Sequence, residues 1–141
     1  MILFAAFHLA AAAPPSIASG IYGNVRMSRK TGDLGGIEIA VHADDAAPFA
    51  EVVVCEGWCN EGRRVVLERT AEGFAFDFVE VVEGGEGEVT FRSRMTIRPA
   101  GKGIAITSTG DVVQEARLPR LKTAFGLAVA ETCRDDCGTK P

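Results

Sequence analysis

The chain has 141 residues, of which 47% are hydrophobic and 24% charged, and its formal net charge is −4. This length suits one domain with a single core, and the composition excludes a disordered chain. The negative charge argues against nucleic acid as a partner, because phosphate groups require a basic surface.

Residues 1–18 differ in composition from the rest of the chain. Residues 1–13 are almost wholly apolar, and Pro14 and Pro15 end any helix there. Ser16 and Ala18 place small residues where a signal peptidase recognises them, so we predict cleavage before Ser19. An apolar N-terminal strand or helix is the alternative, since no Lys or Arg precedes the apolar run. The leader is too short to span a membrane, and we expect a periplasmic or secreted protein without a membrane span.

Alternating polarity predicts a series of short β-strands after the leader. In the first, Ile21 and Val25 alternate with polar residues, the period-two pattern of a half-buried strand. Phe74, Phe76 and Phe78 follow the same spacing, so their rings share one face, where we expect the core to form. The predicted strands cover residues 21–28, 37–42, 52–54, 63–70, 74–78, 88–98, 104–108 and 112–118.

The connections between these strands define the expected fold. Glu83–Gly87 is predicted to be a flexible acidic turn, and residues 120–129 fit either a final strand or a short helix. Short hairpins favour an antiparallel up-and-down barrel of about eight short strands in residues 19–129, because closure removes exposed edges. A β-sandwich is the alternative. Residues 130–141 are expected to form a polar tail that carries a cysteine pair.

The four cysteines form two pairs with the same spacing, Cys55 with Cys59 and Cys133 with Cys137. An exported chain favours disulfides. Residues four apart lie roughly 13 Å from each other in an extended chain, whereas a disulfide spans about 4.4–6.8 Å, so a local bridge requires a turn. The segment 56–58 can form one, and we therefore prefer Cys55–Cys59 and Cys133–Cys137. A bridge between the two pairs and a four-thiolate zinc site are the alternatives.

The tip between Cys55 and Cys59 is the candidate binding loop, with Trp58 as its anchor. A large aromatic side chain on a stapled loop is typical of a binding hot spot. The alternative is that Trp58 folds back to cap the open end of the barrel. The candidate binding residues are Glu56, Gly57, Trp58 and Asn60.

A row of arginines forms a second candidate site. Arg92, Arg94 and Arg98 share one predicted strand face, and an adjoining Arg26 and Lys30 would complete an anion-binding strip for carboxylate or sugar-acid groups. We prefer the interpretation of a solvated outer face on which glutamates such as Glu80 and Glu88 pair with the arginines, because exposed charges contribute little individually.

The residue types give no support for catalysis, and we expect a protein that is not an enzyme, with no catalytic residues, metal or cofactor. His42 is the only histidine after the leader, and no nucleophile motif is present, so a Ser-His-Asp triad is not indicated. We expect His42 on a surface or loop. Nineteen acidic residues permit some carboxylate pairing of the kind glycosidases use, but their spacing nominates no pair.

Three stretches carry a resemblance to a group of small exported bacterial proteins. They are Gly20-Ile21-Tyr22, the segment 31–39 with the pattern Thr-Gly-Asp-x-x-Gly-x-Glu, and the Leu-x-Arg strand at Leu118. Some proteins of this general build are periplasmic lysozyme inhibitors, and others are similar to lipocalins. The resemblance implies a compact antiparallel barrel behind a signal peptide.

The sequence therefore predicts an exported, non-catalytic binding protein. Its stapled loop would meet a protein or cell-envelope partner, and lysozyme inhibition is the most concrete version of that role. The alternative is lipocalin-like carriage of a small apolar ligand, because an eight-stranded barrel lies at the boundary between a filled and a hollow interior.

Overall fold

A computed structural model of the chain describes residue 13 and residues 16–130, and most of the predicted leader and tail lies outside these residues. The described part is dominated by antiparallel strands, as predicted. None of its helices is long and apolar enough to cross a membrane. The strands are β1 Gly20–Gly23, β2 Arg26–Met27, β3 Leu34–His42, β4 Phe49–Cys59, β5 Arg63–Val66, β6 Glu68–Arg69, β7 Phe74–Gly84, β8 Gly87–Ala100, β9 Gly103–Gly110 and β10 Gln114–Leu121.

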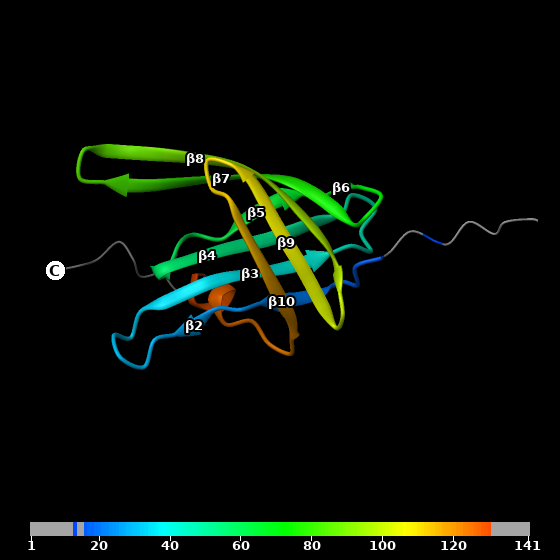
Figure 1. Cartoon of the computed structure of the whole chain (residues 1–141), viewed down its shortest axis with the longest axis horizontal. Coiled ribbons are helices and arrows are strands. Elements are labelled where there is room, and N and C mark those ends of the chain that lie inside the picture. Colours follow the sequence, from blue (N-terminus) through cyan, green and yellow to red (C-terminus); the bar gives the residue numbers. More distant parts are fainter. Residues whose placement is uncertain (1–12, 14–15, 131–141) are drawn as a thin grey trace, which may run out of the picture.

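The strands form one sheet that curls into a nearly closed barrel (Figure 1). Their order is β5-β4-β3-β1-β10-β9-β8-β7-β6, and β2 also pairs with β3. Because β1 pairs with both β3 and β10, the first and last strands are neighbours and close the meander at this point. The remaining seam lies between β5 and β7, which contact each other without pairing. The prediction of an up-and-down antiparallel barrel is confirmed.

The interior of the barrel is filled by side chains that alternate along the strands. Phe74, Phe76 and Phe78 all point inward and are at most 5% exposed. Their neighbours on β8 are Ile97 opposite Phe74 and Met95 opposite Phe76, which are also buried. Paired apolar residues of this kind stabilise a sheet through cross-strand contact and burial. The predicted core face is therefore the core of the molecule.

Several predicted boundaries differ from the structure. The acidic turn expected at Glu83–Gly87 shrinks to residues 85–86, because the β7–β8 ladder continues to Gly84 opposite Gly87. The strand expected at 63–70 divides at the buried Leu67, and its halves pair with different neighbours, β4 and β7. This division produces the seam of the barrel.

The segment after β10 is neither all strand nor all helix: β10 ends at Leu121, and residues 126–130 form a helical turn. The helical turn packs on the outer face of β3 and β4. There it forms a second apolar cluster, separate from the barrel core, of Leu34, Ala40, Val53, Cys55, Cys59, Leu127 and Ala130. Ala130, the first residue of the predicted tail, is thus buried against the barrel.

The residues just before β1 also contact the barrel. Ile17 is 5% exposed and belongs to the barrel core. The hydroxyl of Tyr22 donates a hydrogen bond of 2.8 Å to the carbonyl of Ala18. Both contacts involve residues on the leader side of the predicted cleavage point.

Candidate functional site

Several turns and loops, which are the usual parts of a binding surface, lie together at one end of the barrel. We call it the loop end. It carries the β2–β3 turn, the loop between Cys55 and Cys59, the tip of the β7–β8 hairpin and the β9–β10 turn. The registers place these together, since Leu34 pairs with Gly57 and the backbone of Asp111 bonds that of Arg92.

The candidate binding loop at the end of β4 is closed by the predicted local disulfide. Gly57 adopts a φ of +83°, a conformation that costs glycine little, and the chain reverses there. The Cα atoms of Cys55 and Cys59 come within 3.9 Å, and their sulfurs are bonded. Because these cysteines form a disulfide, they do not supply thiolates to a zinc site. Cys133 and Cys137 lie outside the described residues.

Exposed apolar side chains concentrate at the loop end. Trp58 is 52% exposed, so it extends into solvent to a degree that complete capping of the barrel would not allow. Val113 in the β9–β10 turn is 78% exposed. The same end holds the exposed Met27 of β2 and the exposed Val81, Val82 and Val89 of the β7–β8 hairpin. Exposed large apolar residues gathered in one region mark interaction surfaces more often than single ones do.

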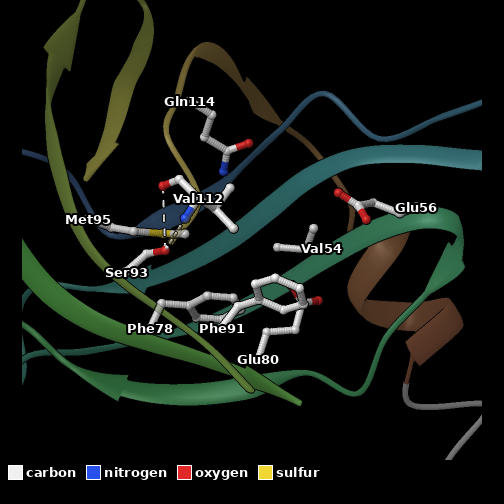
Figure 2. Close-up of a pocket in the computed structure, with 9 residues that line it drawn as sticks. All are labelled: Val54, Glu56, Phe78, Glu80, Phe91, Ser93, Met95, Val112 and Gln114. Atoms are coloured by element: carbon white, nitrogen blue, oxygen red, sulfur yellow. Dashed lines mark hydrogen bonds between the residues drawn. The ribbon is translucent and has the colours of Figure 1, made fainter. Parts of the chain in front are cut away.

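A small pocket of about 30 Å³ lies in the mouth of the barrel at this end (Figure 2). Phe78, Phe91 and Met95 form its apolar part, and the carboxylates of Glu56 and Glu80 lie at its border. Ser93 closes one side, since its hydroxyl bonds both the N–H and the carbonyl of Val112. The complete lining is Val54, Glu56, Phe78, Glu80, Phe91, Ser93, Met95, Val112 and Gln114.

A second pocket of about 140 Å³ lies beside the seam between β5 and β7. The Asn60 side-chain amide donates a hydrogen bond to the Glu80 carboxylate, which links the stapled loop to β7. Arg63 and Val81 also line this pocket. The predicted binding residues Glu56 and Asn60 therefore each border a hollow at the loop end.

The predicted anion strip is divided, and one of its arginines is paired with carboxylates. Arg92, Arg94 and Arg98 lie on the outer side of β8, but Arg26 lies on β2, and β9, β10 and β1 separate the two. Arg94 pairs with Glu68 and Asp77. The hydrogen bonds to Glu68 first, and to Asp77, raise the pKa of Arg94 above its ordinary value. A shallow depression of about 370 Å³ beside Arg92 and Arg94 contains Asp77 as well.

His42 lies at the end of β3 away from the loop end. Its ring stacks on Phe49 with centroids 4.3 Å apart, and its Nε2 is 3.6 Å from a carboxylate oxygen of Glu51. The guanidinium of Arg64 also covers the Phe49 ring, at 3.6 Å. These contacts give His42 a packing role at the barrel end.

Sequence reasoning missed the length of the β7–β8 hairpin and the burial of Glu38. The hairpin was hidden because glycine and glutamate are uncommon in strands. The β-branched residues Val79, Val81 and Val82, which follow the alternating phenylalanines, were the available signal. Glu38 shows no such signal, because its strand reads as half-exposed and only the distant residues 125–127 bury it.

Comparison with protein-family models, with curated proteins and with solved structures found no match. Function is therefore inferred from the loop end itself. Within residues 13 and 16–130, no group of three or more His, Cys, Asp or Glu side chains is arranged to hold a metal ion.

Proposed function

We propose that this is an exported, non-catalytic binding protein that presents its loop end to a protein or cell-envelope partner. The observation that carries the proposal is the exposure of Trp58 on a loop closed by the Cys55–Cys59 disulfide. A tryptophan held by a covalent loop loses little conformational freedom on binding, and preorganisation of this kind favours affinity. Val113 and the valines of the β7–β8 hairpin add apolar contact area at the same end.

The location assigned to the protein, periplasmic or secreted, is part of the proposal. The disulfide supports it, because disulfides persist in oxidising compartments and are rare in a reducing cytosol. The apolar leader that precedes Ser19 supports it independently.

Lysozyme inhibition is the most concrete version of this binding role, and it rests on the resemblance to small exported barrels. Lipocalin-like carriage receives less support from the interior. Pockets for drug-sized ligands occupy about 300–1,000 Å³. The mouth pocket here has about 30 Å³ and the seam pocket about 140 Å³. Phe76 and Ile39 fill the space that a carrier would leave open.

Site-specific photo-crosslinking in the native host tests the binding proposal. A benzophenone amino acid replaces Trp58 at the loop end or, as a control, the exposed Lys102 in the turn at the opposite end. We expect one discrete crosslinked partner from position 58 and none from position 102. Equal crosslinking at both positions, or none at either, would contradict the proposal.

A lysozyme assay separates the concrete version from the general one. If the protein inhibits lysozyme, lytic activity falls on titration with the intact protein, and Trp58→Ala weakens the inhibition. A hot-spot aromatic contributes about 2 kcal/mol or more, so the loss should be about thirtyfold. Undiminished lytic activity at a saturating concentration of the protein would exclude lysozyme as the partner. The crosslinked species would then identify the partner instead.

A further inference from the structure

The β7–β8 hairpin extends beyond the barrel as a two-stranded arm (Figure 1). We use the term arm for residues 79–84 of β7 and 87–92 of β8. The pairing of β8 with β9 begins only at Ser93, and β6 pairs with β7 only at Phe74 and Ala75. Within the arm each strand therefore pairs only with the other, and both outer edges lack a strand neighbour.

Hairpin geometry tells which backbone groups point outward from the arm. Across the turn at 85–86, Gly84 and Gly87 form a hydrogen-bonded pair, and hydrogen-bonded and non-bonded pairs alternate from there. Arg92 is thus expected to point outward, and its N–H does bond Asp111 outside the ladder. On β7 the same alternation turns the N–H groups of Val79, Val81 and Glu83 outward. Beyond Ala75, no described strand pairs with β7 on that side.

Beyond its base, where β5 and Asn60 contact it, this edge of β7 lacks the features that normally prevent strand addition. Exposed edges are usually protected by lysine, proline, a bulge or a covering segment. The β7–β8 ladder runs unbroken from Phe74 to Gly84, and the arm contains neither lysine nor proline. The side chains of Val81 and Val82 are both exposed.

We infer that the outer edge of β7 in the arm accepts an extended, lysine- or arginine-rich segment of a partner protein as an added strand. The inference rests on the proposed binding function and assigns the chemistry of the partner. Charge determines that chemistry, because the arm and its turn, residues 79–92, contain four glutamates, Glu80, Glu83, Glu86 and Glu88, and one basic residue, Arg92. An added strand would form main-chain hydrogen bonds with β7, and its basic side chains would meet these carboxylates.

The charge also argues against two other occupants. In a second copy of this chain, the same four glutamates would face those of the first arm, and like charges oppose such pairing. The chain's own segment 131–141 contains three acidic and two basic residues, so it does not supply the complementary charge.

The seam pocket gives the added strand a place for one side chain. It borders the base of this edge, with Phe78 and Val81 as apolar lining and the Glu80 carboxylate held by Asn60. A lysine or arginine side chain combines an apolar stem with a charged end. Phe78 and Val81 match the stem, and the carboxylates of Glu61 and Glu80 outnumber the single cation of the lining, Arg63. Alternate residues of the added strand would point toward the arm's two faces.

Peptide binding to the intact protein tests the inference. The probe is a fluorescent peptide of about ten residues that alternates lysine and valine, and binding is followed by anisotropy at low and high salt. A matched peptide with alternate N-methylated residues cannot form the ladder. Two lost hydrogen bonds at about 1 kcal/mol each predict binding about thirtyfold weaker. A glutamate–valine peptide should not bind. Equal binding of the methylated peptide, or no binding of the lysine peptide at about 1 mM, would overturn the inference.

Proline substitutions identify the edge. Val81→Pro removes the central outward N–H of β7, whereas Thr90→Pro, directly opposite in the ladder, removes an outward N–H of β8. We expect about tenfold weaker peptide binding for the first and unchanged binding for the second, since one hydrogen bond of about 1–1.5 kcal/mol is lost. Hydrogen exchange on the unsubstituted protein gives the same information without a variant. Peptide binding should protect the amides of Val79, Val81 and Glu83, and unchanged exchange there would overturn the inference.

Two further outcomes separate this inference from the proposed function. If a partner crosslinks at position 58 and Val81→Pro leaves that crosslink unchanged, the binding function stands and strand addition is wrong. If the protein self-associates in sedimentation velocity and Val81→Pro abolishes this, the edge belongs to a second copy, which also overturns the inference.

Discussion

Glu38 shows how a single charged residue holds two parts of this fold together. Its side chain is fully buried between β3 and the segment that follows β10. The carboxylate accepts hydrogen bonds of 3.0–3.2 Å from the backbone N–H groups of Phe125, Gly126 and Leu127. The first N–H groups of a helical turn have no acceptor within the turn, and here the carboxylate accepts from them. Its negative charge also interacts favourably with the partial positive charge at the N-terminal end of the turn.

Replacement of Glu38 by alanine should destabilise the protein by about 3 kcal/mol, because three N–H groups would lose their acceptor in a buried position. Glu38→Gln keeps one acceptor oxygen and should lose less. The measurement is the free energy of unfolding in urea for each variant. Glu51→Ala removes an exposed carboxylate from the neighbouring strand and serves as the matched control. If Glu38→Ala were as stable as this control, the carboxylate would not hold the turn.

At the scale of elements, the stapled loop and the helical turn 126–130 depend on each other. A Cβ atom added to Gly126 would lie 3.0 Å from Val25, 3.2 Å from Val53 and 3.5 Å from the sulfur of Cys55. The turn therefore packs directly on the disulfide and on β4. Both cysteines are buried in the same cluster as Leu127.

Removal of the disulfide should loosen the loop and the helical turn together. A bridge that closes so short a loop contributes about 2 kcal/mol by loop-closure entropy, so Cys55→Ala with Cys59→Ala should lower stability by about that amount. Hydrogen exchange should rise at the amides of Phe125 and Leu127, whose acceptor Glu38 belongs to the same outer layer. The amides of the β8–β9 ladder provide the internal control. Unchanged protection at residues 125–127 would show that the two elements are independent.

The sequence was sufficient to predict those elements whose contacts are local or follow a strict period. Phe74, Phe76 and Phe78 predicted the core because burial on one face repeats every two residues. The Cys55–Cys59 bridge followed from a turn within five residues. The length of the arm was not predicted from the sequence. The segment Glu83–Gly87 consists of residue types that are uncommon in strands, yet the β7–β8 pairing extends through Glu83 and Gly84 to Gly87.

The candidate site was predictable only in part, for the same physical reason. Trp58 and its loop are adjacent in sequence and were identified. The second apolar cluster joins β3 and β4 to residues almost ninety positions later, and alternation along β3 predicted an outward, solvated Glu38. Likewise the arginine strip required β8 and β2 to be neighbours, and the strand order separates them.

For the molecule as a whole, the two ends of the barrel differ in character. The loop end holds Trp58, the arm, the pocket in the mouth of the barrel and the pocket beside the seam. The opposite end holds the stack of His42, Phe49 and Arg64 and receives the segment that enters β1. Ile17 lies there in the core and contacts the turn at Gly73. The segment that enters β1 and the proposed binding surface therefore lie at opposite ends of the barrel, so the predicted cleavage before Ser19 would leave the loop end intact.

The residues that directly precede β1 should have a measurable effect on stability. Cleavage before Ser19 removes Ile17 from the core and the Ala18 carbonyl from Tyr22. Burial of an isoleucine side chain contributes about 2 kcal/mol and a hydrogen bond about 1 kcal/mol. A chain that begins at Ser19 should therefore unfold at lower urea than one that begins at Ser16, by about 3 kcal/mol in free energy. Ile17→Ala in the longer chain should reproduce most of the loss, because it removes the side chain and keeps the Ala18 carbonyl. Equal stability of the two chains would mean that Ile17 does not hold the barrel end closed. The intact mass of the protein isolated from its host then decides which of the two forms is present.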